Sequence, residues 1–290
     1  EIEAQGLRPA EVVPDGQLHR CPVQGKPGAR DGAFILYGDD NPTGWWQNWR
    51  TGAQGTWSAE RDRPLAKSER QRFAQQLEAA KREREAERAQ EWAKAAQRAA
   101  DMLDQAEPCQ AHPYLEAKGI QPCPGIKVDP DGKLLVPVLG PDGKPQSLQT
   151  IAPDGEKRFL AGGKMAGCYF PIRGDAGRLL VCEGLSTGLS LYEAIGATVL
   201  VAFNCGNLEA VASLARERYP ERPITICGDD DHKTEGNPGR AKATEAARAA
   251  GCLMALPKFS GESTGTDFND LHQAEGLESV KAQVKAAQEP

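Results

Sequence analysis

The residues best suited to chemistry are carboxylates that follow short apolar runs in the second half of the chain. Glu183 directly follows R-L-L-V-C, Asp229 and Asp231 follow P-I-T-I-C-G, and Asp267 and Asp270 lie within T-G-T-D-F-N-D-L-H. Open α/β sheets place their ligands beyond the carboxyl ends of their strands. We therefore expect these side chains to meet at one edge of a sheet.

The run Asp229-Asp230-Asp231 is hard to explain by packing alone, because like charges this close repel unless a cation or proton neutralises them. Alternate spacing lets Asp229 and Asp231 share a pocket while Asp230 faces elsewhere. Hard oxygen ligands with few histidines nearby suit Mg²⁺ or Mn²⁺. The pattern predicts a divalent metal site. A solvated acidic turn is the alternative, and Asp267 or Asn269 could simply cap a turn.

Basic residues near these acids are candidates for holding phosphate groups, because polyanion capture needs cations and helix N-terminal amides favour phosphate. The candidates for nucleotide or template phosphate are Lys157, Arg158, Lys164, Lys233, Arg240 and Lys242. A solvated hairpin is the alternative for the first three.

The elements that must position these residues follow from the pattern of apolar runs. From Arg178 onward, apolar runs alternate with helical stretches, which predicts a parallel sheet covered by helices. Between about 125 and 173, Asp-Gly turns separate strand-like runs and predict a β-meander. No Gly or Pro occurs between Leu65 and Glu107, which predicts a helix of ~65 Å if unbroken. Residues 61–98 hold eleven Lys or Arg against seven Asp or Glu, so this helix is either a spacer or a phosphate-tracking face.

Four of the five tryptophans cluster in residues 32–57, where aromatic residues alternate with turn formers as in short antiparallel strands. Trp45, Trp46 and Trp49, interleaved with Arg50, are candidates for stacking on bases of a single-stranded template. A small β-module also uses aromatics to build its core, and both interpretations stay open.

The totals for the 290 residues narrow the class of protein. A net charge of -6 argues against an all-over polyanion-binding surface, although a local basic stripe can lie beside an acidic metal site. No apolar run approaches the ~20 residues of a membrane span, and we expect a cytoplasmic protein without a membrane partner. The eight cysteines form no C-x-x-C pair, so we expect neither zinc nor a disulfide framework.

The acidic motifs together resemble a known family. A strand-end Glu-Gly, a D-x-D after a later strand, and D-F-N-D-L resemble, over 178 to 287, the Toprim domain of DNA primases from plasmids, phages and other mobile elements. Y-L-E-A-K-G-I, L-L-V-P-V and G-E-K-R-F-L-A-G-G-K resemble, less specifically, the region that precedes Toprim in those primases.

The resemblance implies roles for individual residues. Glu183, Asp229 and Asp231 would be catalytic and would bind or position Mg²⁺ or Mn²⁺, with Glu183 as a candidate general acid or base. Asp267 and Asp270 would complete the metal shell.

The activity that the resemblance implies is that of a DNA primase, a nucleotidyltransferase that makes short primers from nucleoside triphosphates on single-stranded DNA by two-metal transfer. Such primases often begin with a cysteine zinc ribbon, and none can be written from Cys21 and Cys109. There is no G-x-x-x-x-G-K-[ST] loop, so unwinding would come from a separate replicative helicase.

The expected fold class is α/β. We expect a Toprim domain over 178–290, a β-rich primase lobe over 108–177, a long charged helix or helical linker over 63–107, and a small aromatic β-module over 1–62 that is a candidate for template binding.

Two other functions stay open. A Toprim-type metal-dependent nuclease would use the same acids to activate water against a phosphodiester. A catalytically inactive accessory module would bind single-stranded DNA through the tryptophans and the charged helix. A topoisomerase would need a tyrosine on a large gate domain, for which these residues leave no length.

Overall fold

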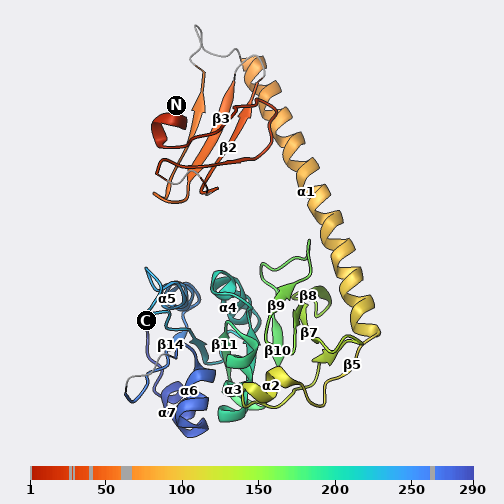
Figure 1. Cartoon of the computed structure of the whole chain (residues 1–290), viewed down its shortest axis with the longest axis vertical. Helices are drawn as coiled ribbons and strands as arrows, with labels where there is room; N and C mark the ends of the chain where they lie inside the picture. The colour runs from red at the N-terminus through yellow and green to blue at the C-terminus, as the bar shows by residue number, and fades with distance from the viewer. Residues whose placement is uncertain (1, 26–27, 29, 39–41, 60–66, 262–264) are drawn as a thin grey trace. The chain divides into compact units, whose positions relative to one another are not determined.

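The computed structural model describes residues 2–25, 28, 30–38, 42–59, 67–261 and 265–290 (Figure 1). At 67–74, 76–77 and 80 it describes the backbone alone. The chain divides into two compact units, Glu1–Ala80 and Lys81–Pro290. Among the described residues, no helix combines the length and the apolar character needed to cross a lipid bilayer.

The first unit contains an antiparallel four-stranded sheet in the order β1-β2-β3-β4. Its elements are η1 (Ile2–Gln5), β1 (His19–Cys21), β2 (Gly32–Tyr37), β3 (Thr43–Asn48) and β4 (Ala53–Ser58). The register places Phe34 opposite Trp46, and both rings pack with Leu7 and Cys21 in a small core. Aromatic side chains therefore build this unit from within.

One long helix, α1 (Lys67–Asp104), contains the boundary between the two units. Its residues are mostly good helix formers, and the described side chains from Lys81 to Glu91 are all exposed. Toward the C-terminal end, Ala95 and Ala99 are fully buried. The helix is therefore solvated in its middle and packed at its end.

The second unit begins with a five-stranded antiparallel sheet in the order β5-β6-β7-β8-β9. The strands are β5 (Glu107–Pro108), β6 (Lys127–Val128), β7 (Leu134–Leu139), β8 (Pro145–Ile151) and β9 (Lys157–Phe159), and the short helix α2 (Pro113–Ala117) lies between the first two. Gly132, Gly143 and Gly155 all have positive φ in the Asp-Gly turns between strands. The β-meander expected from these dipeptides is confirmed.

The α/β part has a five-stranded sheet in the order β10-β12-β11-β13-β14, in which β10 is antiparallel and the others are parallel. The strands are β10 (Phe170–Ile172), β11 (Ala176–Cys182), β12 (Ala197–Val201), β13 (Ile224–Cys227) and β14 (Leu253–Ala255). The expected α/β class is confirmed, although the sheet begins upstream of residue 178, with β10.

Helices cover both faces of this sheet (Figure 1). They are α3 (Leu185–Ile195), η2 (Cys205–Asn207), α4 (Leu208–Arg218), α5 (Pro238–Ala250), α6 (Phe268–Glu275) and α7 (Leu277–Lys285). Alternate residues of β11 point to opposite faces. Leu180 and Cys182 pack with α3, α6 and α7, whereas Leu179 and Val181 pack with α4 and α5.

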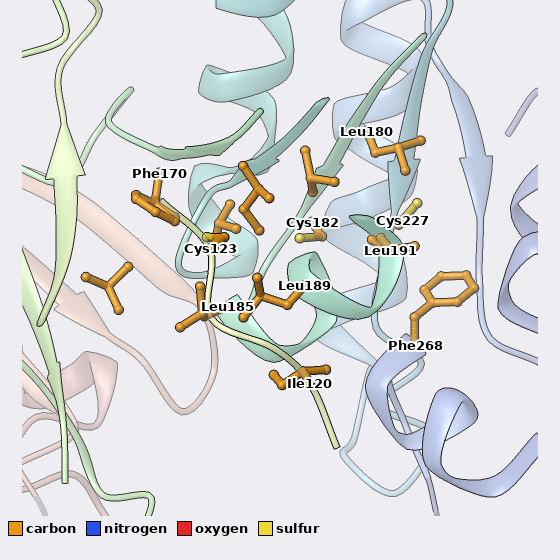
Figure 2. Close-up of a cluster of buried hydrophobic side chains, with 14 of the residues drawn as sticks. Ile120, Cys123, Phe170, Leu180, Cys182, Leu185, Leu189, Leu191, Cys227 and Phe268 are labelled. Atoms are coloured by element: carbon orange, nitrogen blue, oxygen red, sulfur yellow. The ribbon is translucent and has the colours of Figure 1, made fainter. Parts of the chain in front are cut away.

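The core on the α3 face joins the β-meander and the parallel sheet into one body. Figure 2 shows Cys182 of β11 and Cys227 of β13 in one cluster with Leu189 and Leu191 of α3 and Phe268 of α6. Buried residues of β7 and β8 belong to the same cluster. A core shared in this way fixes the β-meander relative to the carboxyl ends of the parallel strands.

Close packing of α5 against Gly228, the residue after β13, predicts that one added methyl group will destabilise the fold. A Cβ at Gly228 would lie 2.5 Å from the Ala243 Cβ, which cannot rotate away. We expect Gly228→Ala to reduce the free energy of unfolding by about 1–3 kcal/mol. Thermal denaturation would show a melting temperature lower by roughly 2–10 °C.

The matched control is Gly177→Ala in β11, because a Cβ there meets no atom within 4 Å. It should leave the melting temperature within about 2 °C of wild type. An equal fall in melting temperature in both variants would contradict the claim that close packing at Gly228 excludes a methyl group.

Candidate active site

The ends of two neighbouring parallel strands bring the first acidic residues together. Cys182 of β11 pairs in register with Cys227 of β13. Glu183 directly follows the first strand, and Asp229 follows the second after one glycine. Because the strands are adjacent, parallel and in register, both carboxylates lie at the carboxyl edge of the sheet.

The environment of these two carboxylates favours their protonated forms. Burial, with repulsion from Asp231 and Asp267, raises the pKa of Glu183 to about 7. Burial, with repulsion from Glu183 and Asp267, raises the pKa of Asp229 to about 9. Within the described part of the chain, no donor reaches the buried Glu183 Oε1 or Asp229 Oδ1. Two oxygens at this edge are therefore available to a further ligand.

Asp267 and Asp270 reach the same edge from the start of α6. Asp267 is the N-cap of this helix, and its Oδ1 accepts a hydrogen bond from the Asp270 amide at 2.8 Å. The Asp270 Oδ2 accepts one from the Thr266 amide at 2.9 Å. Burial raises the pKa of Asp267, and both residues add to the repulsion on Asp229. The two acids thus cap a helix and also contribute negative charge to the site.

The remaining two acids of the Asp229–Asp231 run differ in their partners. Asp231 Oδ2 accepts a hydrogen bond from the Gly239 amide at the start of α5, 3.0 Å away. Asp230 instead accepts from Asn237 Nδ2 at 2.6 Å and forms a 2.9 Å ion pair with Arg240. Burial alone would raise the pKa of Asp230, but these two partners leave it below its ordinary value. Asp230 therefore stabilises the loop before α5.

A strained turn after β12 shapes the wall beside Glu183. Phe203 adopts φ of 71°, a left-handed conformation that is unusual for a bulky residue, and its amide donates to the Glu183 carbonyl at 2.8 Å. The backbone N–H of Cys205 donates to the Glu183 carboxylate. No sequence signal marks either residue, because a positive φ at Phe203 depends on the tertiary contacts that stabilise it.

Asn269, predicted from the sequence only as a candidate turn cap, belongs to a buried polar network that fixes α6. Asn269 Nδ2 donates to the Lys118 carbonyl at 2.9 Å and to Ser190 Oγ at 3.0 Å. Ser190 Oγ also lies 3.1 Å from His272 Nδ1. The network ties α6 to α3 and to the end of α2. It therefore holds Asp267 at the sheet edge.

The predicted phosphate-binding residues fall into separate places. The ring of Phe159, in the same strand as Lys157 and Arg158, makes an edge contact with Phe203 at 5.9 Å, so β9 reaches the wall beside Glu183. Lys157 Nζ lies 5.3 Å from the centre of the Tyr114 ring, and Arg158 pairs with Glu156.

The other four basic candidates lie on different elements. Lys164 Nζ lies 5.2 Å from the centre of the Trp92 ring. Arg240 is paired with Asp230 and Lys242 with Glu245, so both would have to exchange partners to hold a phosphate. Lys233 is exposed in the loop before α5.

The three tryptophans predicted to stack on template bases do not form one surface. Trp46 is 8% exposed and packs in the core of the first unit. Trp45, its neighbour in β3, points to the opposite face of the sheet. Trp49 is 41% exposed, and the Arg20 guanidinium lies 3.8 Å from the centre of its ring. The position of Trp46 supports a packing role, whereas Trp49 is accessible.

The acidic edge has the right donors for a hard cation. Among the residues that the structure describes, no group of three or more His, Cys, Asp or Glu side chains is close enough together to hold a metal ion in this conformation. The two unpartnered carboxylate oxygens of Glu183 and Asp229, with Asp231 and Asp267 beside them, are nevertheless the hard donors that Mg²⁺ and Mn²⁺ prefer. A bound cation would also relieve the mutual repulsion.

Comparison with known proteins identifies the domain that contains this edge. Residues 178–278 match the family described as Toprim domain, so the chain carries a Toprim domain and that part of the expected resemblance is confirmed. Two curated relatives, both DNA primase TraC of Escherichia coli, are 39% and 34% identical to this chain. The matches cover 89% and 86% of this chain but 18% and 24% of the relatives, so the chain spans less than a quarter of their length.

Solved structures provide one further comparison. The primase fragment of the bacteriophage T7 primase-helicase protein matches with a TM-score of 0.43 at 16% identity, over 61% of this chain and 74% of that chain.

The raised pKa of Asp229 predicts how stability depends on pH without divalent metal. Its folded-state pKa of about 9 lies above the unfolded value, so the stabilisation is complete below about pH 4 and is lost as pH rises toward 9. At pH 8 the Asp229 carboxyl must take up a proton when the chain folds, whereas an asparagine is neutral without one, so Asp229→Asn should stabilise the metal-free protein by about 2 kcal/mol. In EDTA, the melting temperature should rise by roughly 4–8 °C, with the gain shrinking toward pH 4.

The adjacent Asp230 provides the control, because its substitution should change the melting temperature in the opposite direction. Asp230 has a lowered pKa, so its carboxylate contributes stability above the unfolded pKa, and Asp230→Asn should lower the melting temperature at pH 8. A loss of stability at pH 8 in both variants would show that Asp229 is not a strained carboxylate.

Proposed function

We propose that this chain is the primer-synthesising part of a DNA primase, which joins nucleoside triphosphates into short primers on a single-stranded DNA template. The observation that carries the proposal is the set of buried, mutually repelling carboxylates at the carboxyl edge of a Toprim sheet, two with unpartnered oxygens. The 39% identity to a protein named DNA primase TraC supports it.

Glu183, Asp229 and Asp231 are the residues that would hold Mg²⁺ or Mn²⁺, with Asp267 and Asp270 completing the shell. When bound, such ions would neutralise the nucleotide triphosphate and lower the pKa of the primer 3′-hydroxyl. Primer synthesis requires this acidic edge to approach a polyanion, which its own charge would otherwise repel.

The protein's own groups would supply proton transfer and positioning. The pKa of Glu183, raised to about 7 by burial, suits a group that takes or gives a proton near neutral pH. We propose that Lys157 and Arg158 bind nucleotide or template phosphates, because the contact between Phe159 and Phe203 brings their strand beside Glu183. Lys164, Lys233, Arg240 and Lys242 are further candidates for the same polyanion.

The biological setting of the proposed enzyme follows from its motifs. We propose that the chain acts in replication of a plasmid, phage or other mobile element, and the resemblance of its motifs to primases of such elements supports this. A separate replicative helicase would open the template. The proposed division of labour assigns 178–290 to catalysis, 108–177 to the primase lobe, 63–107 to a helical linker and 1–62 to template contact.

Primer synthesis tests the proposal directly. With single-stranded DNA, labelled nucleoside triphosphates and Mg²⁺ or Mn²⁺, the full chain should make short oligonucleotides that are resolved by length. Glu183→Gln and Asp229→Asn should each reduce synthesis by at least about 100-fold, because both remove a charge from the reacting edge. Asp175→Asn, at an exposed loop before β11, should keep activity within about twofold of wild type.

Other outcomes of the same assay would favour a different function. Degradation of the template without synthesis would indicate a nuclease that uses the same edge. Near wild-type synthesis in either Glu183→Gln or Asp229→Asn would contradict the assignment of the acidic edge.

Template contact by the first unit predicts different effects for neighbouring tryptophans. Trp49→Ala should weaken binding of single-stranded DNA by about 5- to 50-fold through loss of stacking, with little change in stability. Trp46→Ala should instead destabilise the unit by about 3–5 kcal/mol, because it empties the small core. Fluorescence anisotropy and thermal denaturation separate the two effects, and unchanged affinity in a folded Trp49→Ala variant would remove template stacking from the proposal.

A further inference from the structure

A concave site lies at the opposite end of the parallel sheet from the acids. It is a pocket of about 370 Å³. Thr198 lies at the start of β12, Arg173 follows the antiparallel strand β10, and Tyr219 caps the C-terminal end of α4. These positions all belong to the amino end of the parallel strands. The pocket is therefore separate from the carboxyl edge that holds Glu183.

The charge of this pocket is opposite to that of the chain as a whole. Arg173, Arg218 and Arg222 line it, and its described lining includes no carboxylate. Across the described chain, none of these guanidinium groups forms a salt bridge. Three arginines are thus gathered without a counter-charge in a protein of net charge -6. Guanidinium groups bind phosphate oxygens in a planar, two-pronged geometry.

The pocket also offers an aromatic ring and an apolar floor. Tyr219 is 37% exposed, with the Arg218 and Arg222 guanidinium groups 5.9 and 5.4 Å from the centre of its ring. Leu179 and Leu200 lie buried beneath. A ring beside cations and above an apolar floor suits a nucleobase whose backbone phosphates lie at the rim, since any base can stack on an aromatic face.

The loop that presents these groups is held in place by a neighbouring arginine. Arg216 donates to the carbonyls of Pro220 and Arg222 at 2.9 Å each, and to those of Ala250 and Gly251 at 3.1 and 2.9 Å. These four bonds tie the turn after α4 to the end of α5. A loop ordered in advance loses little conformational entropy when a ligand binds.

We propose that Arg173, Arg218, Tyr219 and Arg222 form a second nucleic-acid site, which binds a segment of single-stranded DNA away from the acidic edge. We refer to these four residues as the arginine–tyrosine pocket. A concave site of about 370 Å³ with one aromatic ring suits an unstacked base, which a single strand offers and a duplex does not.

This site goes beyond the proposed primer synthesis and can be tested without it. The probe is a fluorescent oligothymidylate of about 20 nucleotides, which exceeds the span of one small site. Its anisotropy is measured with the full chain in EDTA and without nucleotides, over a series of NaCl concentrations. Binding therefore does not report on metal or catalysis, and failure here would leave the synthesis result unaffected.

The triple substitution Arg173→Ala, Arg218→Ala and Arg222→Ala should weaken binding at least about 10-fold, and should reduce the slope of log K against log salt by about 2, as expected for three lost phosphate contacts. The matched control is Lys285→Ala, an exposed cation on α7, which should change affinity less than about twofold. Thermal denaturation checks that both variants remain folded.

The ring provides a test that does not depend on charge. Tyr219→Phe should retain affinity, whereas Tyr219→Leu should lose about 5-fold or more because the stacking face is gone. A 5-iodouracil oligonucleotide should cross-link to the Tyr219 peptide in wild type and in Tyr219→Phe. Unchanged affinity and salt slope in the folded triple variant would overturn the proposal. So would tighter binding at this pocket of a labelled acidic peptide than of the oligonucleotide, because that result would assign the pocket to a protein partner.

Discussion

Burial of mutually repelling carboxylates at the carboxyl edge of the parallel sheet is the constraint on which the rest of the α/β part depends. Burial raises the pKa of both Glu183 and Asp229, and mutual repulsion raises it further. Holding these carboxylates together therefore costs free energy, which the rest of the fold must supply. The in-register pairing of β11 with β13 brings them together, and the buried Asn269 keeps α6 and its acids in place. An arrangement that opposes its own electrostatics is typical of a functional site rather than of a stabilising one.

The surrounding structure shows how such a site is supported. Gly239 lets the start of α5 approach so closely that an added Cβ would lie 2.7 Å from the Asp229 carbonyl oxygen. Asp230, in the middle of the acidic run, turns away and pairs with Arg240, which secures the loop that carries its two neighbours. The shared core also fixes the β-meander, so that Phe159 reaches Phe203 beside Glu183. Packing and polar contacts remote from the acids thus determine where the acids lie.

Acidic and basic side chains gather at opposite ends of the parallel strands, although the chain as a whole has a net charge of -6. The carboxyl ends of the parallel strands carry acids that suit a divalent cation, whereas the amino ends carry Arg173, Arg218 and Arg222 around an exposed tyrosine. A polyanion could therefore meet a neutralised acidic edge at one end and a basic pocket at the other. Both features lie in the second unit, which has a single continuous core on its α3 face.

Local patterns in the sequence were enough to predict the α/β class, the β-meander with its Asp-Gly turns, and the acids that follow β11 and β13. Those features depend on short-range periodicity and on turn residues, which the chain carries wherever it folds. The Toprim motifs likewise lie in short segments.

The sequence could not show that Asp230 pairs with Arg240, that Trp46 faces inward while Trp49 stays exposed, or that Phe203 adopts a left-handed conformation. It also gave no sign that Arg173 would meet Arg218 and Tyr219. Contacts between residues far apart in the chain decide these outcomes, because the side of an element that becomes buried and the partner that a charge finds depend on the packed neighbours.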